Sequence, residues 1–165
     1  MGPTCSIIYE NEPMEKNTMI QKPRPFSTTF FNWRELTTSI FQGLMITAGA
    51  LFVYRYAVMH SYNEFITRTM IFTVLITANI FLTLVNRSFY YSVITTLKYK
   101  NNLVVLIIGT TLFLAALMIY LKPLAAFFSF HELNFQQLSV STLIGFVSVI
   151  WFEGVKWTNR LKKKI

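Results

Sequence analysis

Four long apolar runs restrict most strongly how this chain can fold. Each is about 17 to 22 residues long, and they cover residues 37–58, 69–85, 103–121 and 136–152. A helix needs roughly 20 apolar residues to cross the hydrocarbon layer of a bilayer, whereas a transmembrane barrel strand needs about 9 to 11 and alternates apolar with polar residues. Because the runs are longer and lack that alternation, they predict an all-α membrane protein with four transmembrane helices.

Composition supports this prediction. The 165 residues are 53% hydrophobic and only 13% charged, against roughly 25% charged residues in soluble domains. The last run is the most polar of the four, with a series of small and hydroxylated residues: Ser139, Ser141, Thr142, Gly145 and Ser148. Such residues allow close approach of helices in lipid, so we expect this run to be a spanning helix packed against its neighbours.

The positions of the basic residues predict the topology. The net charge is +8, and if four helices alternate in direction, twelve of the fifteen Lys and Arg fall on the side that holds both termini. The opposite side has only Arg55, Arg68 and Lys122. The positive-inside rule therefore places both termini in the cytoplasm. We interpret the charge as a sign of topology and of contact with the lipid bilayer, and we expect no nucleic-acid partner.

The chain divides into two parts. Residues 1–9 are mildly apolar and are interpreted as the end of a preceding helix. Residues 10–34 contain three prolines, Pro13, Pro23 and Pro25, among charged residues, which predicts an extended cytoplasmic loop because proline removes a donor and restricts its predecessor. Residues 35–165 form the predicted four-helix transmembrane domain.

Few residues suggest catalysis. The sequence has no aspartate, no G-x-S-x-G nucleophile motif and no G-x-x-x-x-G-K-[ST] phosphate loop, so no catalytic or cofactor-binding residue is predicted. The two histidines, His60 and His131, fall in the expected outer loops. Two histidines without acidic support make a weak metal site, and we interpret them as surface residues.

Polar residues inside apolar runs are more informative, because each is costly in hydrocarbon without a partner or a water-filled path. Gln42 and Glu153 stand near the cytoplasmic ends of their runs, within reach of the interface or of each other. Asn79 stands near the middle of the second run. Its amide oxygen is a hard neutral ligand for cations such as Ca²⁺, and the alternative is a hydrogen bond between helices. The pattern alone leaves both roles open.

A resemblance to a known family begins in the proline-rich arm. The segment EPMEKNTMIQKPRP resembles the cytoplasmic loop after the sixth transmembrane helix of type II P-type cation-transporting ATPases, especially calcium pumps. The matching positions are Glu12, Pro13, Met19, Pro23 and Arg24. Farther along, TRTMIFTVLITANIFLTLVNRS is similar to the family's eighth helix, and LKPLAAFFSFHELN is similar to the outer loop between its last two helices. Glu153, Lys156 and Arg160 match a closing E-x-x-K-x-x-x-R pattern.

The resemblance implies a role for each part. The four runs would be the seventh to tenth helices of a bacterial calcium pump of the plasma-membrane type, in the cytoplasmic membrane. Asn79 falls where the family has a cation ligand, and the arm would couple the ion-binding helices to the phosphorylation domain. Aligning Pro13 puts Gly2 where the family has a coordinating aspartate. ATP and Mg²⁺ are implied only for the complete pump.

The chain would thus act with the rest of the pump and the transported cation, and it would not be active alone. Its start at Met1 is interpreted as a start inside a longer pump. The alternative is an autonomous four-helix membrane protein that serves as an accessory subunit or a small channel. A channel should repeat polar residues along several helices, and only the second run approaches that pattern.

Overall fold

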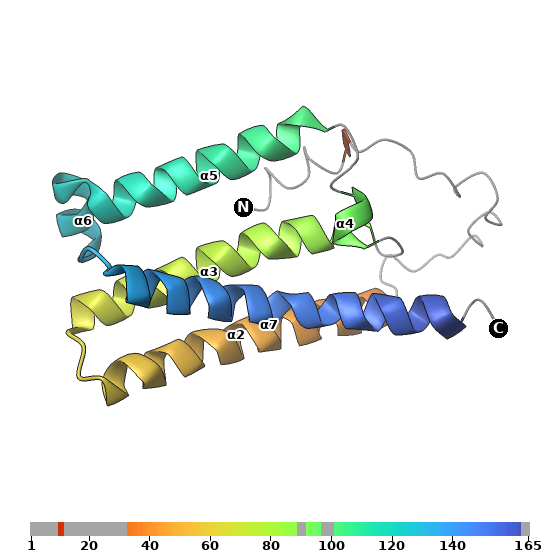
Figure 1. Ribbon diagram of the computed structural model, residues 1–165, viewed down its shortest axis with the longest axis horizontal. Coiled ribbons are helices and arrows are strands. Elements are labelled where there is room, and N and C mark those ends of the chain that lie inside the picture. The colour runs from red at the N-terminus through yellow and green to blue at the C-terminus, as the bar shows by residue number, and fades with distance from the viewer. Residues whose placement is uncertain (1–9, 12–32, 89–91, 97–100, 163–165) are drawn as a thin grey trace.

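The computed structural model describes residues 10–11, 33–88, 92–96 and 101–162. In these ranges every regular element is a helix (Figure 1). Four are long: α2 (Trp33–Met59), α3 (Glu64–Val85), α5 (Asn102–Tyr120) and α7 (Phe135–Lys162). Two are short: α4 (Val93–Thr96) and α6 (Lys122–Phe128). Each long helix is long and apolar enough to span a membrane, which confirms the all-α membrane fold with four spans.

Three of the long helices pack together, and the fourth stands to one side. In Figure 1, α7 lies along both α2 and α3, while α5 is separated from that group. The start of α2, the end of α3, α4 and the end of α7 lie at one end of the bundle. We call this the inner end, because the positive-inside rule assigns it to the cytoplasm, and we call the opposite end the outer end.

Two apolar clusters form the core between α2, α3 and α7. The cluster nearer the outer end contains Val53, Ala57, Met70, Val74 and Leu133. The cluster nearer the inner end contains Ala78, Val85, Val149 and Phe152. Ala57 and Ala78 are small, which lets the helix axes approach closely where they lie.

A glycine marks the closest crossing of α3 and α7. A Cβ atom at Gly145 would lie 2.9 Å from the Cβ of Thr77 and 2.9 Å from the carbonyl oxygen of Val74. No side chain fits there without moving backbone. The expected packing role of the small residues in the last run is thus observed at Gly145, and Ser148 similarly occupies the space beside Gly49 on α2.

The outer end differs from the simple helix and loop pattern. α3 begins at Glu64, before the expected start at residue 69. Its first turn is stabilised by Glu64, since an acidic residue interacts favourably with a helix N-terminus, and Arg68 pairs with Glu64 at 2.8 Å. Beyond α5 the chain forms α6, which has a proline in its first turn and ends at Ser129 in the left-handed conformation, with φ of 56°.

Candidate functional site

Asn79, the predicted cation ligand, lies on α3 close to the inner end. At 1.5 Å per residue it is about 9 Å along the axis from Val85, where the helix ends. Because α3 also extends to Glu64 at the outer end, Asn79 occupies the inner third of the helix and not its middle. The side chain is half-buried.

The amide group of Asn79 has a defined orientation. Its Nδ2 donates a hydrogen bond to the backbone carbonyl oxygen of Leu75, one turn earlier, at 2.8 Å. A carbonyl oxygen can only accept, so the nitrogen must face Leu75 and Oδ1 must point away from it. Within the described ranges no group donates a hydrogen bond to that oxygen. Toward the described residues, the amide therefore presents an acceptor with both lone pairs available.

The face of α3 that carries Leu75 and Asn79 differs from the face that contacts α7. That contact uses Val74, Thr77 and Ala78, whereas Leu75, beside the Asn79 amide, remains 39% exposed. Thr83 donates its hydroxyl to the backbone oxygen of Asn79 at 2.8 Å, so it supports the helix at this turn. The amide thus lies where the described helices leave α3 partly uncovered.

One amide oxygen cannot hold a cation by itself. Ca²⁺ takes six to eight oxygen ligands, and the part of the chain that the structure describes contains no cluster of three or more His, Cys, Asp or Glu side chains. Asn79 therefore does not form a complete cation site with acidic, His or Cys side chains of the described residues.

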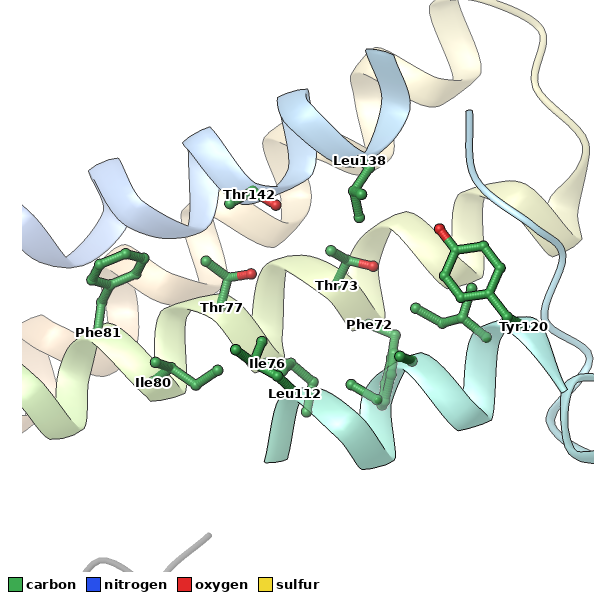
Figure 2. Close-up of a pocket in the computed structure, with 13 residues that line it drawn as sticks. Phe72, Thr73, Ile76, Thr77, Ile80, Phe81, Leu112, Tyr120, Leu138 and Thr142 are labelled. Carbon is green, nitrogen blue, oxygen red and sulfur yellow. The ribbon is translucent and has the colours of Figure 1, made fainter. Parts of the chain in front are cut away.

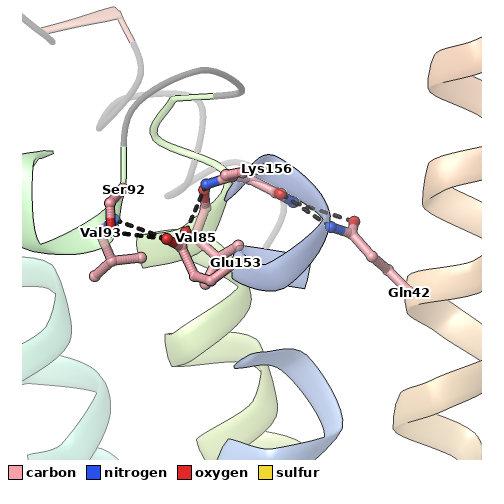
Figure 3. Close-up of polar contacts among 7 residues, drawn as sticks. Gln42, Val85, Ser92, Val93, Glu153 and Lys156 are labelled. Atoms are coloured by element: carbon pink, nitrogen blue, oxygen red, sulfur yellow. Dashed lines mark hydrogen bonds and ion pairs between the residues drawn. The ribbon is translucent and has the colours of Figure 1, made fainter. Parts of the chain in front are cut away.

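A polar network ties the helices together at the inner end (Figure 3). Lys156 is only 2% exposed, and its Nζ donates to Glu153 on α7 at 2.8 Å and to the backbone oxygen of Val85 on α3. The other carboxylate oxygen of Glu153 accepts from the hydroxyl of Ser92 at 2.9 Å and from the backbone nitrogen of Val93 at 3.3 Å. The pair thus joins α7 to the end of α3 and to the start of α4.

Gln42 has a different partner from Glu153. It is buried on α2 and donates to Oδ1 of Asn86 at 3.1 Å, while Nδ2 of Asn86 donates back at 3.4 Å. The expected reach of Gln42 and Glu153 toward each other is not observed, because each pairs with another residue. Asn86 was missed because it follows the apolar run, although the spacing of Glu153 and Lys156, three residues apart on a helix, was a visible signal for their pair.

Several predicted residues lie outside the described part of the chain. These are the residues of the arm, Glu12, Pro13, Met19, Pro23 and Arg24, together with Gly2. The two histidines are described, and each places Nδ1 near a backbone oxygen: His60 near that of Tyr56 at 2.9 Å, and His131 near that of Glu132 at 3.1 Å.

Comparison with known families shows to which family the chain that carries Asn79 belongs. The family described as "Cation transporting ATPase, C-terminus" matches residues 1–158. The chain belongs to this family. The match includes the arm, α3 with Asn79, and the Glu153 and Lys156 pair. A comparison with curated proteins found no match.

This cation ATPase C-terminal domain is thus the C-terminal membrane part of a multi-pass cation pump. Its partners are the rest of that pump and the transported cation. The polar network at the inner end and the glycine crossing of α3 and α7 hold the helix that carries Asn79 against the rest of the domain.

Proposed function

We propose that the domain forms helices seven to ten of a calcium pump of the type II plasma-membrane class, in a bacterial cytoplasmic membrane. In this proposal Asn79 offers its amide oxygen to the transported Ca²⁺. The arm, with Glu12, Pro13, Met19, Pro23 and Arg24, couples the ion-binding helices to the phosphorylation domain. ATP and Mg²⁺ act on domains that the resemblance places outside these residues, so the domain alone does not hydrolyse ATP.

The observation that carries the proposal is that Oδ1 of Asn79 accepts no hydrogen bond from the residues that the structure describes. A polar side chain in a spanning helix is costly unless it has a partner. The Nδ2 group of Asn79 donates its hydrogen bond to the backbone oxygen of Leu75. Oδ1 is available to a group outside the described residues. A cation is a suitable partner, because amide oxygens are hard ligands of the kind that Ca²⁺ prefers.

The neutral donor has a consequence for the rest of the site. Asn79 brings no charge, so carboxylates elsewhere in the pump must balance the charge of Ca²⁺. A carboxylate at position 79 would add charge to the site and strengthen its attraction for a divalent cation. The proposal therefore predicts opposite effects for two substitutions of the same residue.

The test uses the complete pump that contains this domain. Calcium-dependent ATP hydrolysis is measured for the natural protein, Asn79→Ala and Asn79→Asp. We expect Asn79→Ala to raise the calcium concentration for half-maximal activity about tenfold, equivalent to about 1.4 kcal/mol, and Asn79→Asp to lower it, because a carboxylate adds attraction for the divalent cation.

The control is Asn86→Ala, which removes the same type of side chain from the inner end of α3. Expression level and thermal unfolding are compared for all variants, so that loss of folding is distinguished from loss of binding. Equal calcium dependence for Asn79→Ala and the natural pump would contradict the role of Asn79 and return it to a packing function. If ATP hydrolysis by the natural pump does not respond to calcium but depends on another cation, only the calcium assignment is contradicted.

A further inference from the structure

We propose that the domain binds one phospholipid whose head group carries both a phosphate and a primary ammonium. One acyl chain lies between α3, α5 and α7, and the head group lies beside Lys122 and Glu132 at the outer end. This site is separate from Asn79 and does not depend on which cation the pump transports.

The acyl-chain part is a cavity of about 420 Å³ between α3, α5 and α7. Figure 2 shows Phe72, Ile76 and Ile80 of α3 on one side and Leu112 of α5 facing them, with Leu138 of α7 nearby. The cavity exists because α5 stands away from the packed group of α2, α3 and α7. Its lining is almost entirely apolar and lies along spanning helices, so a hydrocarbon chain is a chemically matched occupant.

Size argues for a lipid chain and against another helix. A helix with its side chains is about 10 to 12 Å across and rises 1.5 Å per residue, so it displaces about 120 to 170 Å³ per residue. The cavity of about 420 Å³ could thus take only about three residues of a helix. A spanning helix needs roughly 20 residues, whereas an acyl chain is narrow and flexible enough to enter.

The head-group part is a second cavity at the outer end of the first. It has a volume of about 400 Å³ and shares Ile119 and Tyr120 with the acyl-chain cavity. Its polar lining includes Lys122, His131 and Glu132. Apolar and polar cavities that share two residues match a molecule with an apolar tail and a polar head.

The charges in the second cavity indicate the type of head group. Lys122 supplies a cation and Glu132 an anion, and Lys122 forms no ion pair with any residue in the described ranges. A phosphate would pair with Lys122, and an ammonium that can donate hydrogen bonds would pair with Glu132. A phosphatidylethanolamine head group has both, whereas phosphatidylglycerol lacks the ammonium and phosphatidylcholine has one that cannot donate hydrogen bonds.

The experiment uses the full chain in lipid nanodiscs that contain a phosphatidylethanolamine probe with a photoreactive group at the end of one acyl chain. Cross-linked residues are located by mass spectrometry after illumination. We expect labels on the residues of α3, α5 and α7 that line the cavity. Unlabelled phosphatidylethanolamine should compete about tenfold more effectively than phosphatidylglycerol or phosphatidylcholine, equivalent to about 1.4 kcal/mol.

Two pairs of variants separate the two parts of the site. Ala116→Trp fills the acyl-chain cavity and should reduce labelling about tenfold. Its control, Val105→Trp, lies on α5 outside the cavity lining at a residue that is 75% exposed. Lys122→Ala and Glu132→Gln should remove the preference for phosphatidylethanolamine, whereas Arg55→Ala, another exposed basic residue at the outer end, should retain it.

Equal labelling of Ala116→Trp and Val105→Trp would show only the general lipid around the domain and would overturn the acyl-chain site. Equal competition by the three lipids would overturn the head-group assignment. If Ala116→Trp does not fold, the competition experiment with Lys122→Ala and Glu132→Gln still decides, because neither substitution changes the apolar cavity.

Discussion

The ammonium group of Lys156 on α7 donates a hydrogen bond to the carbonyl oxygen of Val85, the last residue of α3. The last carbonyl groups of a helix have no partner within it and carry partial negative charge. A cation supplied by another helix satisfies one of them and links the two helices at the same depth. Glu153 and the ring of Phe152, whose centroid lies 5.7 Å from Nζ, also lie against the ammonium.

The first prediction concerns this contact. Lys156→Met keeps most of the apolar stem but removes the charge, so the Val85 carbonyl and the Glu153 carboxylate both lose a donor. Hydrogen bonds that involve a charged group contribute about 1.5 to 3 kcal/mol each. We expect the free energy of unfolding to fall by about 3 kcal/mol or more, measured by denaturation of the chain in detergent.

Arg55→Met is the control for Lys156→Met. Because Arg55 is exposed, its substitution should leave the free energy of unfolding nearly unchanged. In a double-mutant cycle with Glu153→Gln, the two changes should be less than additive, since they remove the same pair. Strict additivity would contradict a direct interaction between Lys156 and Glu153.

The second prediction concerns the crossing of α3 and α7. Gly145→Ala places a Cβ against the backbone oxygen of Val74 and the Cβ of Thr77, so the helices must separate. Overpacking of this kind costs about 1 to 3 kcal/mol. We expect Gly145→Ala to lower the unfolding temperature of the chain in detergent.

Gly109→Ala is a matched control, since a Cβ at Gly109 meets no atom within 4 Å and alanine favours a helix by about 1 kcal/mol over glycine. The two substitutions should therefore have opposite signs. A stabilising Gly145→Ala would show that α3 and α7 are not in close contact at this point.

The third prediction concerns the amide pair of Gln42 and Asn86. Each side chain donates to the other, so Gln42→Ala and Asn86→Ala should each destabilise the contact of α2 with α3. Hydrogen bonds between membrane helices contribute about 0.6 kcal/mol on average and up to about 1.7 kcal/mol. We expect a coupling energy in this range from a double-mutant cycle on unfolding, and a coupling energy of zero would contradict the pair.

The fourth prediction concerns the outer end of α3. Thr69 is fully buried, and its hydroxyl donates to the carbonyl of Phe65 at 2.8 Å while it accepts from the backbone nitrogen of His131 at 3.0 Å. Thr69→Val keeps the shape but leaves the His131 nitrogen without an acceptor, which costs about 1 to 3 kcal/mol for a buried group. We expect faster amide hydrogen exchange at His131.

Thr47→Val is the control for Thr69→Val. Thr47 is exposed, and its hydroxyl bonds only within its own helix, to the carbonyl of Gly43 at 2.9 Å. It should leave exchange at His131 unchanged. Unchanged exchange in Thr69→Val as well would contradict the contact between α3 and the segment before α7.

Much of the fold could be predicted from the sequence because membrane spans depend on length and apolarity, which are local properties. The four runs lie within or close to the four long helices, and the small residues of the last run do face α2 and α3 at Gly145 and Ser148. The early start of α3 was missed because Glu64 and Arg68 are charged. Apolarity marks the part of a helix in lipid and not its capped end in the interface.

The partners of the polar residues were harder to predict. Lys156 belongs to a basic segment and looks solvated by sequence, yet it is buried because α3 ends beside it. The partner of Gln42 could not be predicted without knowing that Asn86, just after the end of α3, lies at the same depth as Gln42. Such pairs depend on the relative heights of helices, which the sequence of one helix does not contain. The role of Asn79 stays a prediction.

The close crossing at Gly145 limits how α3 can move relative to α7 in a complete pump. Backbone atoms of α3 lie against α7 there, and Lys156 fastens the same two helices nearer the inner end. With two points of attachment, α3 can neither rotate nor slide without taking α7 along. In the proposed pump, α3 and α7 therefore shift as one unit, so Asn79 keeps its position relative to α7 and changes in its distance to other cation ligands come from movement between this unit and other helices.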